Sequence, residues 1–123
     1  MKALKIMLVD NNNQFRNSAI SFINNNVKFE IIMWASSSEE AITKISTHSF
    51  DLVILDLNID GLNGLETTKK IRSFNKSIKI IITTFNNNFE YKEQSLAAGA
   101  NEFIPKQNFA EQLLPTIARI FYN

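Results

Sequence analysis

A single acidic residue ends one of the most apolar stretches of this sequence. Asp56 follows the run from Leu52 to Leu55, and such a run is typical of a strand buried on both faces of a parallel sheet. Burying an unpaired carboxylate inside that strand would cost several kcal/mol. Asp56 is therefore expected at the C-terminal end of the strand, where open α/β sheets bind their ligands. The alternative interpretation is an aspartate that only begins a turn.

Other polar side chains follow other strand-like segments in the same way. Asp10 comes after the apolar residues 4–9, Thr83 and Thr84 end the β-branched residues 79–84, and Lys106 follows residues 102–104. Because the C-terminal ends of parallel strands share one edge of a sheet, these side chains are expected to converge. Taken singly, Lys106 could be a solvated loop lysine and Thr84 a turn residue. The occurrence of all these polar residues at strand ends favours a functional site.

This set of side chains suits phosphoryl chemistry. Asp10, Asp56 and a backbone carbonyl offer the oxygen ligands that Mg²⁺ prefers, with some of its waters retained. A carboxylate can attack phosphorus and form an acyl phosphate. The metal, a lysine and a hydroxyl would then neutralise charge on the phosphoryl oxygens. This chemistry makes Asp56 the acceptor, Lys106 the phosphate-binding cation and Thr84 the hydroxyl donor.

Strand-like and helical patterns alternate along the whole chain. Strands are expected at residues 4–9, 29–35, 52–56, 79–84 and 102–104, and helical periodicity or capping signals lie between them, including the capping box of Ser37 and Glu40. Gly61 and Gly64 separate the third strand from its helix, and Gly99 suits a left-handed helix end. The pattern predicts a doubly wound (βα)5 α/β fold with a parallel sheet of order 2-1-3-4-5, which is flavodoxin-like.

Composition excludes several classes of function. The 123 residues suit a single domain spanning 1–123, and the net charge of +1 gives no reason to expect nucleic-acid or membrane binding. There is no cysteine, which excludes disulfides and thiolate chemistry. No apolar run approaches the roughly 20 residues that cross a bilayer. The only histidine, His48, is expected to be a solvated loop residue. A cytoplasmic location is the default expectation.

The sequence resembles the receiver domain of bacterial two-component response regulators over essentially its whole length. It is most similar to receivers of the nitrate-regulator and quorum-regulator class, which usually carry a C-terminal helix-turn-helix output domain. The motifs that carry the resemblance are IMLVDNNNQFR, DLVILDLNIDGLNGLET, IIITTF, EYKEQSLAAGANEFIPK and AEQLLPTIARI.

The resemblance implies a role for each matching position. Asp56 matches the residue that accepts a phosphoryl group from a sensor histidine kinase, and Lys106 matches the family's site lysine. Counting back from Gly99 and Lys106 without gaps places the switch hydroxyl at Thr84 rather than Thr83. Phe103 matches the switch aromatic. Its rotation reports phosphorylation to the face formed by helix 4, strand 5 and helix 5, through which a homodimer is possible.

The resemblance also implies a Mg²⁺ site. Its ligands would be Asp10, Asn11, Asp56 and the backbone carbonyl of Asn58. The implied output is control of transcription, through an output domain or a partner, with no direct nucleic-acid contact by this domain. Phosphotransfer and slow autodephosphorylation would be its only chemistry, so the chain is not expected to be an enzyme in the usual sense.

The chain departs from the family pattern at four positions. The family has two adjacent acids where this chain has Asp10-Asn11, so one charged metal ligand becomes neutral and Mg²⁺ affinity should fall. Asp60 replaces a proline, and Phe85 stands where a small residue is common. Gln107 replaces the proline of the usual Lys-Pro pair.

Two alternatives remain open at this point. A degenerate, non-phosphorylated receiver would act as a constitutive protein-interaction module, and Asn11 favours it. A flavodoxin-like nucleotide or cofactor binder is disfavoured, because residues 11–13 are Asn-Asn-Asn where a glycine-rich phosphate loop would be required.

Overall fold

The computed structural model describes residues 3–26, 28–59, 63–86 and 88–122. Asp60 and Gly61, which the sequence singles out, lie outside these ranges. The elements in chain order are β1 (Leu4–Val9), α1 (Asn13–Asn24), β2 (Phe29–Ala35), α2 (Ser38–Thr47), β3 (Leu52–Asp56), α3 (Gly64–Phe74), β4 (Lys79–Thr84), α4 (Phe89–Ala98), β5 (Glu102–Pro105), a 3₁₀ turn (Lys106–Asn108) and α5 (Phe109–Phe121).

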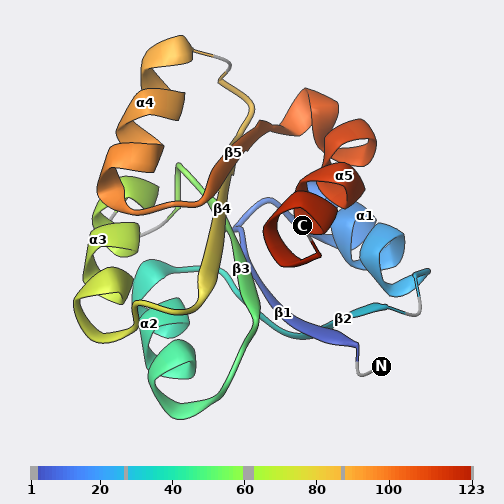
Figure 1. Cartoon of the computed structure of the whole chain (residues 1–123), viewed down its shortest axis with the longest axis horizontal. Coiled ribbons are helices and arrows are strands. Elements are labelled where there is room, and N and C mark those ends of the chain that lie inside the picture. The colour runs from blue at the N-terminus through green and yellow to red at the C-terminus, as the bar shows by residue number, and fades with distance from the viewer. Residues whose placement is uncertain (1–2, 27, 60–62, 87, 123) are drawn as a thin grey trace.

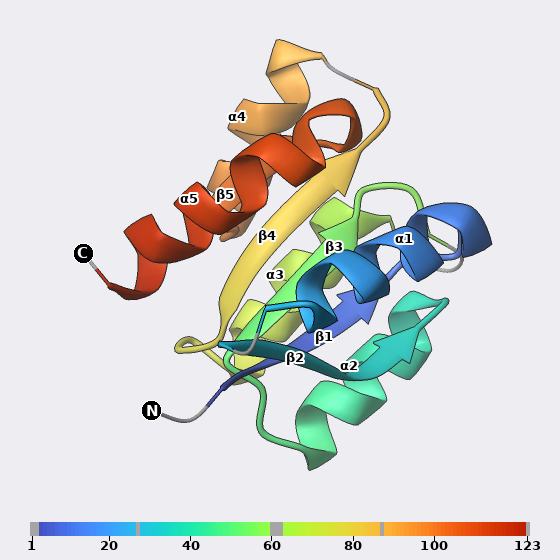
Figure 2. The ribbon, with the colours of Figure 1, turned by 90° about the vertical axis from the view of Figure 1, so that its right-hand side faces the viewer.

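The strands form one parallel sheet in the order β2-β1-β3-β4-β5, which confirms the predicted α/β fold and strand order. Figure 1 shows α2, α3 and α4 on one face of the sheet and α1 and α5 on the other. In Figure 2, strands β1 and β4 point away from the end of the molecule where both termini lie. No helix within the described ranges combines the length and apolar character that crossing a bilayer requires.

The core lies in two layers, one on each face of the sheet. Successive residues of a strand point to opposite faces. In β3, Val53 and Leu55 accordingly pack under α2 and α3, whereas Leu52 and Ile54 pack under α1 and α5. All residues of β3 are buried, as expected for the central strand of a parallel sheet.

Asparagine side chains begin several of the helices. Asn12, Asn63 and Asn88 each accept a hydrogen bond from a backbone N–H in the first turn of α1, α3 and α4, respectively. Ser37 does the same for α2, but Glu40 bonds back to the N–H of Ser36 rather than to that of Ser37, so the predicted capping box is shifted by one residue. Asn12 and Asn88, which belong to the Asn-Asn-Asn runs 11–13 and 86–88 of the sequence, thus have a structural use in helix initiation.

The C-terminal region differs slightly from the sequence-based boundaries. Strand β5 extends to Pro105, and a 3₁₀ turn separates it from α5, which begins at Phe109. The described part of the chain contains no cis peptide bond, so the bond between Lys106 and Gln107 is trans. Gly99 has φ 118° and ends α4 in the left-handed conformation, as predicted.

Gly64 allows α3 to start directly against the end of β3. Its N–H donates to the carbonyl of Leu57 at 2.7 Å. A Cβ on residue 64 would lie 2.7 Å from both the carbonyl oxygen of Asp56 and the Cα of Leu57, which are backbone atoms. A larger residue would therefore push the helix away from the segment that holds Asp56.

We expect Gly64→Ala to lower the free energy of unfolding by about 1–3 kcal/mol, because overpacking against backbone atoms forces a shift. Helix propensity alone favours alanine over glycine by up to about 1 kcal/mol, so the contact and the propensity predict opposite signs. Denaturant titration measures the change. Lys70→Ala, an exposed substitution in the same helix, is the control. A stabilised Gly64→Ala protein would contradict the packing argument.

Candidate functional site

A lysine and two aspartates meet at the C-terminal edge of the sheet. The Nζ atom of Lys106 lies 2.8 Å from Oδ2 of Asp10 and 3.5 Å from Oδ2 of Asp56. All three side chains are buried. Three segments far apart in the sequence therefore supply one charged cluster, as the strand-end pattern predicts.

The alternation of the strands explains why these side chains share a face. Leu8, Ile54 and Ile104 belong to the core layer under α1 and α5. Asp10, Asp56 and Lys106 each stand two residues further along the chain. The period of two directs Asp56, the last residue of β3, to that side, and Asp10 and Lys106, which come just after β1 and β5, meet it there.

The acid–base properties of Asp56 reflect its surroundings. Burial raises the pKa of its carboxyl from 3.8 to about 6, and the neighbouring Asp10 adds to the increase, whereas the Lys106 ammonium lowers it. The cluster contains one more carboxylate than ammonium groups. Above pH 6 it therefore holds an unbalanced negative charge in surroundings from which water is largely excluded.

Asn58 connects Asp56 to Thr84. The backbone N–H of Asn58 donates to Oδ1 of Asp56 at 3.3 Å, and its side-chain Nδ2 donates to Oγ1 of Thr84 at 3.4 Å. Oγ1 of Thr84 also accepts from the backbone N–H of Asn86 at 3.1 Å. Both bonds leave the hydroxyl hydrogen of Thr84 available for an acceptor.

Thr83 contributes a second hydroxyl, which the resemblance does not assign to the site. It is the direct neighbour of Asp56 in the sheet register. Its Oγ1 is buried and has no hydrogen-bond partner among the described residues. The alternation of β4 places it on the α1 and α5 side, the side of the charged cluster.

The loop after β1 is held by an arginine. Nη1 of Arg16 donates to the carbonyl of Asp10 at 2.9 Å, and its guanidinium lies 3.9 Å from the ring centroid of Trp34. The backbone N–H of Asn12 donates to Oδ1 of Asp10 at 2.8 Å. These contacts fix one carboxylate oxygen of Asp10, while Asn11 beside it is exposed.

The residues present fit a hard divalent cation. Oδ2 of Asp10 is buried and forms an ion pair with Lys106. Within the described ranges it accepts no hydrogen bond. Mg²⁺ is commonly held by one or two carboxylates together with phosphate oxygens and water. Asp10 and Asp56 meet this requirement, although the described residues contain no cluster of three His, Cys, Asp or Glu side chains.

Two aromatic rings lie over the lysine, an arrangement that the sequence patterns do not predict. Nζ of Lys106 lies 4.4 Å from the ring centroid of Phe15 and 4.7 Å from that of Phe85. The side chain of Gln107 donates to the backbone carbonyl of Phe85 at 2.8 Å. A large residue after Thr84 was the only signal in the sequence, because Phe15 follows a helical pattern that is typical of core packing.

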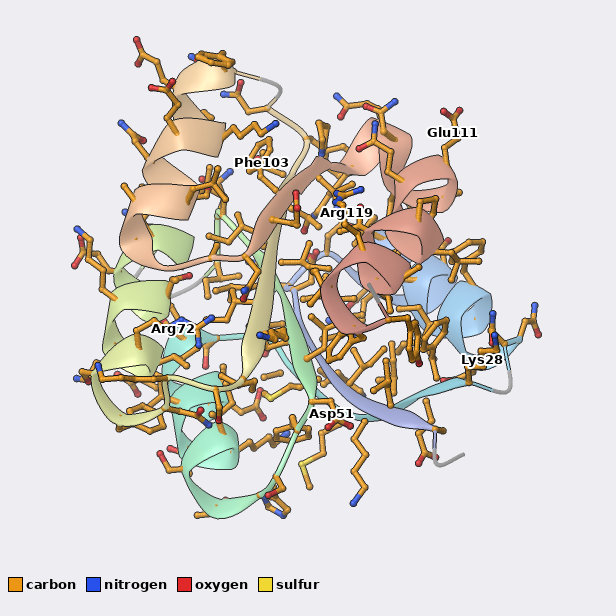
Figure 3. All side chains as sticks on the ribbon, in the orientation of Figure 1. Lys28, Asp51, Arg72, Phe103, Glu111 and Arg119 are labelled. Carbon is orange, nitrogen blue, oxygen red and sulfur yellow. The ribbon has the colours of Figure 1, made fainter. Side chains whose placement is uncertain are left out.

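Phe103 lies away from the charged cluster. It is buried on the α4 side of β5, in the core layer that also includes Tyr91 (Figure 3). A hollow of about 490 Å³ adjoins it. The residues that line this hollow are Asn88, Phe89, Lys92, Phe103, Pro105, Asn108 and Gln112.

We expect Asp56→Asn to stabilise the metal-free protein at pH 7.5. A pKa raised from 3.8 to about 6 means that the folded state binds the proton more tightly than the unfolded state. Ionisation of Asp56 therefore lowers the free energy of unfolding. This loss of stability is absent below about pH 3.8, grows as the pH rises, and is complete above pH 6, at about 3 kcal/mol. Asparagine removes it, so the gain at pH 5 should be about half of that at pH 7.5.

Denaturant titration in buffer with EDTA, at both pH values, tests this expectation. Asp51→Asn is the matched control, because its exposed carboxylate accepts a hydrogen bond from the backbone N–H of Lys5 and its removal should bring no gain. A loss of stability in Asp56→Asn at pH 7.5, or a gain that does not change with pH, would contradict the argument.

Comparison with known proteins gives one family for nearly the whole chain. Residues 6–118 match the model of the response regulator receiver domain. A nitrate/nitrite response regulator protein homolog from Haemophilus influenzae is 32% identical over 117 residues, which are 95% of this chain and 56% of that protein. The nitrate/nitrite response regulator protein NarL from Escherichia coli strain K12 is 30% identical over 112 residues, 91% of this chain and 52% of that protein.

The chain thus spans about half the length of these relatives. A solved structure of a LuxR family two-component response regulator from Aurantimonas sp. SI85-9A1 is 25% identical, with a TM-score of 0.90, and covers 96% of this chain and 84% of its own. The predicted family and its nitrate-regulator and quorum-regulator class are confirmed. The chain belongs to the response regulator receiver domain family.

Proposed function

We propose that this chain receives a phosphoryl group on Asp56 from a sensor histidine kinase and switches a protein-interaction surface in response. The observation that carries the proposal is the buried cluster of Asp10, Asp56 and Lys106. In this cluster the carboxylate of Asp56, the nucleophile, lies 3.5 Å from the ammonium group of Lys106, so both groups can contact one phosphoryl group. Membership of the receiver family supports the choice of a histidine kinase as the donor.

The transfer is a displacement at phosphorus. An oxygen of the Asp56 carboxylate bonds to the phosphorus atom, the bond from phosphorus to the donor nitrogen breaks, and the imidazole leaves with the electron pair. Asp56 must be ionised for this attack, which its pKa of about 6 allows at neutral pH. The raised pKa also makes the carboxylate more basic than that of an exposed aspartate.

The chain's own groups stabilise the transferred charge. The Lys106 ammonium already lies 3.5 Å from Asp56 and needs only a small displacement to reach a phosphoryl oxygen. Thr84 offers its hydroxyl hydrogen from the Asn58 side. Asp10, Asp56 and the carbonyl of Asn58, with Asn11 nearby, would hold Mg²⁺, which the family generally binds at the phosphorylation site and which screens the phosphoryl charge when bound.

The position of Phe103 supports the choice of an output surface. Phe103 adjoins a hollow between α4 and the start of α5, and Phe89 beside it is 70% exposed. We propose the face formed by α4, β5 and α5 as the surface that contacts a partner or a second copy of the chain. Control of transcription through such a contact, in the cytoplasm, is the output that we propose for this receiver. The near-neutral charge of the chain supports no direct role in nucleic-acid binding.

We expect one phosphoryl adduct on the protein after incubation with acetyl phosphate and Mg²⁺. Asp56→Asn should carry none, and Asp51→Asn should still be labelled, because Asp51 lies at the opposite end of β3. Intact mass spectrometry measures the adduct, and its loss in hydroxylamine identifies an acyl phosphate. An unlabelled protein at saturating Mg²⁺ would refute the proposal and leave the constitutive interaction module.

We expect Asn11→Asp to tighten Mg²⁺ binding by at least about tenfold, because it adds a negative charge next to Asp10. Titration calorimetry measures the affinity. Asn12→Asp is the matched control, since it adds the same charge one residue further on, at the N-cap of α1. Equal tightening in both variants would show that Asn11 has no special place in the metal site.

A further inference from the structure

The ammonium group of Lys106 lies between carboxylates and aromatic ring faces. Its Nζ is 2.8 Å from Asp10, and it is 4.4 Å and 4.7 Å from the ring centroids of Phe15 and Phe85. Both ring distances are within the roughly 6 Å at which a cation is attracted to an aromatic face. The lysine thus has aromatic partners as well as acidic ones.

The two rings belong to one packed unit. Phe15 meets Phe85 edge to face, with centroids 6.2 Å apart and planes at 77°. It meets Phe109, at the start of α5, in the same way at 5.1 Å. The bond from Gln107 to the carbonyl of Phe85 ties the loop after β4 to the residue that follows Lys106.

The rings also control solvent at the lysine. The Lys106 side chain is only 2% exposed, whereas Phe85 itself is 55% exposed. Apolar groups beside the ammonium replace water that would otherwise solvate it. In such surroundings its attraction to a carboxylate or a phosphoryl group is stronger than in water, and so is its attraction to a ring.

We propose that Phe15 and Phe85 form an aromatic clamp that positions the Lys106 ammonium beside Asp56 and restricts the access of water to the acyl phosphate. This inference rests on the proposed function. The two phenylalanines are positioning residues, because they contact Lys106 and not the reacting atoms. In the hydrolysis that the clamp slows, water oxygen bonds to phosphorus and its proton passes to the phosphate. The bond from phosphorus to the Asp56 oxygen breaks, and inorganic phosphate leaves.

Three variants separate the parts of this clamp. Phe15→Leu and Phe85→Leu keep apolar bulk but remove the aromatic face, and Phe85→Ala also opens the space above the lysine. Phe22→Leu is the control for Phe15→Leu, because Phe22 also lies on α1 and packs on Phe109, at 6.3 Å, but is not one of the rings over Lys106. Phe74→Ala is the control for Phe85→Ala, since Phe74 is a half-exposed ring on α3.

The first readout is the NMR signal of the Lys106 ε-methylene protons in the unphosphorylated protein. Ring faces close to Nζ should shift these protons upfield in the wild type. The shift should decrease in both Phe15→Leu and Phe85→Leu and stay unchanged in Phe22→Leu. A general change in core packing would affect Phe15→Leu and Phe22→Leu alike. A difference between these two variants therefore reports the loss of the ring over Lys106. Unchanged lysine signals in both clamp variants would overturn the proposal.

The second readout is the lifetime of the acyl phosphate after acetyl phosphate is removed. We expect Phe85→Ala to shorten it roughly fivefold, the scale of one lost cation–π contact. Phe74→Ala should leave it unchanged. If the wild type is labelled and Phe85→Ala keeps the same lifetime, the clamp is refuted and the proposed function stands. If the wild type carries no phosphoryl group, the proposed function fails and the clamp fails with it.

Discussion

One lysine held between two aspartates at the edge of the sheet sets the conditions that the rest of the structure must meet. Lys106, Asp10 and Asp56 are all buried, and removing three charges from water costs several kcal/mol for each ion unless their geometry is good. Burial raises the pKa of Asp56, and the neighbouring Asp10 adds to the increase, because the ammonium balances only one of the two carboxylates. A cluster with an excess negative charge and little water is suited to a cation, and it keeps a basic carboxylate ready for an electrophile.

The backbone of the fold supplies the geometry that this cluster needs. The parallel register places Asp56 beside Thr83, and the segments that follow β1 and β5 bring Asp10 and Lys106 to the same edge. Each helix that follows a strand begins at this edge of the sheet, and asparagine caps fix the first turns of α1, α3 and α4. Helix N-termini carry a partial positive charge, so their arrangement around the edge favours the excess negative charge of the cluster. Gly64 lets α3 begin directly against the end of β3.

The sequence was sufficient for the fold and for the cluster, because both depend on strong local patterns. Continuous apolar and β-branched runs located the strands, and the polar residue after each run located the edge where Asp56 and Lys106 meet. Such patterns do not predict contacts that depend on the direction of a side chain. Phe15 has the spacing of a core residue on α1, yet its ring also covers Lys106. Thr83 and Thr84 are adjacent in sequence, and only the sheet register shows that Thr83 is the direct neighbour of Asp56.

Asn11 and Phe85, both at this edge of the sheet, act in opposite directions on the proposed chemistry. Residue 11, next to Asp10, is a neutral asparagine, and it lacks the negative charge with which an aspartate would attract a divalent cation. The ring of Phe85 lies over the Lys106 ammonium, and in the proposed clamp it keeps water from this group and so strengthens its field on a phosphoryl group. A receiver with both features relies less on its metal ion and more on its lysine to stabilise phosphoryl charge. On this proposal the neutral asparagine is compatible with a working acceptor, because a lysine that is better shielded from water would offset the lost attraction for Mg²⁺.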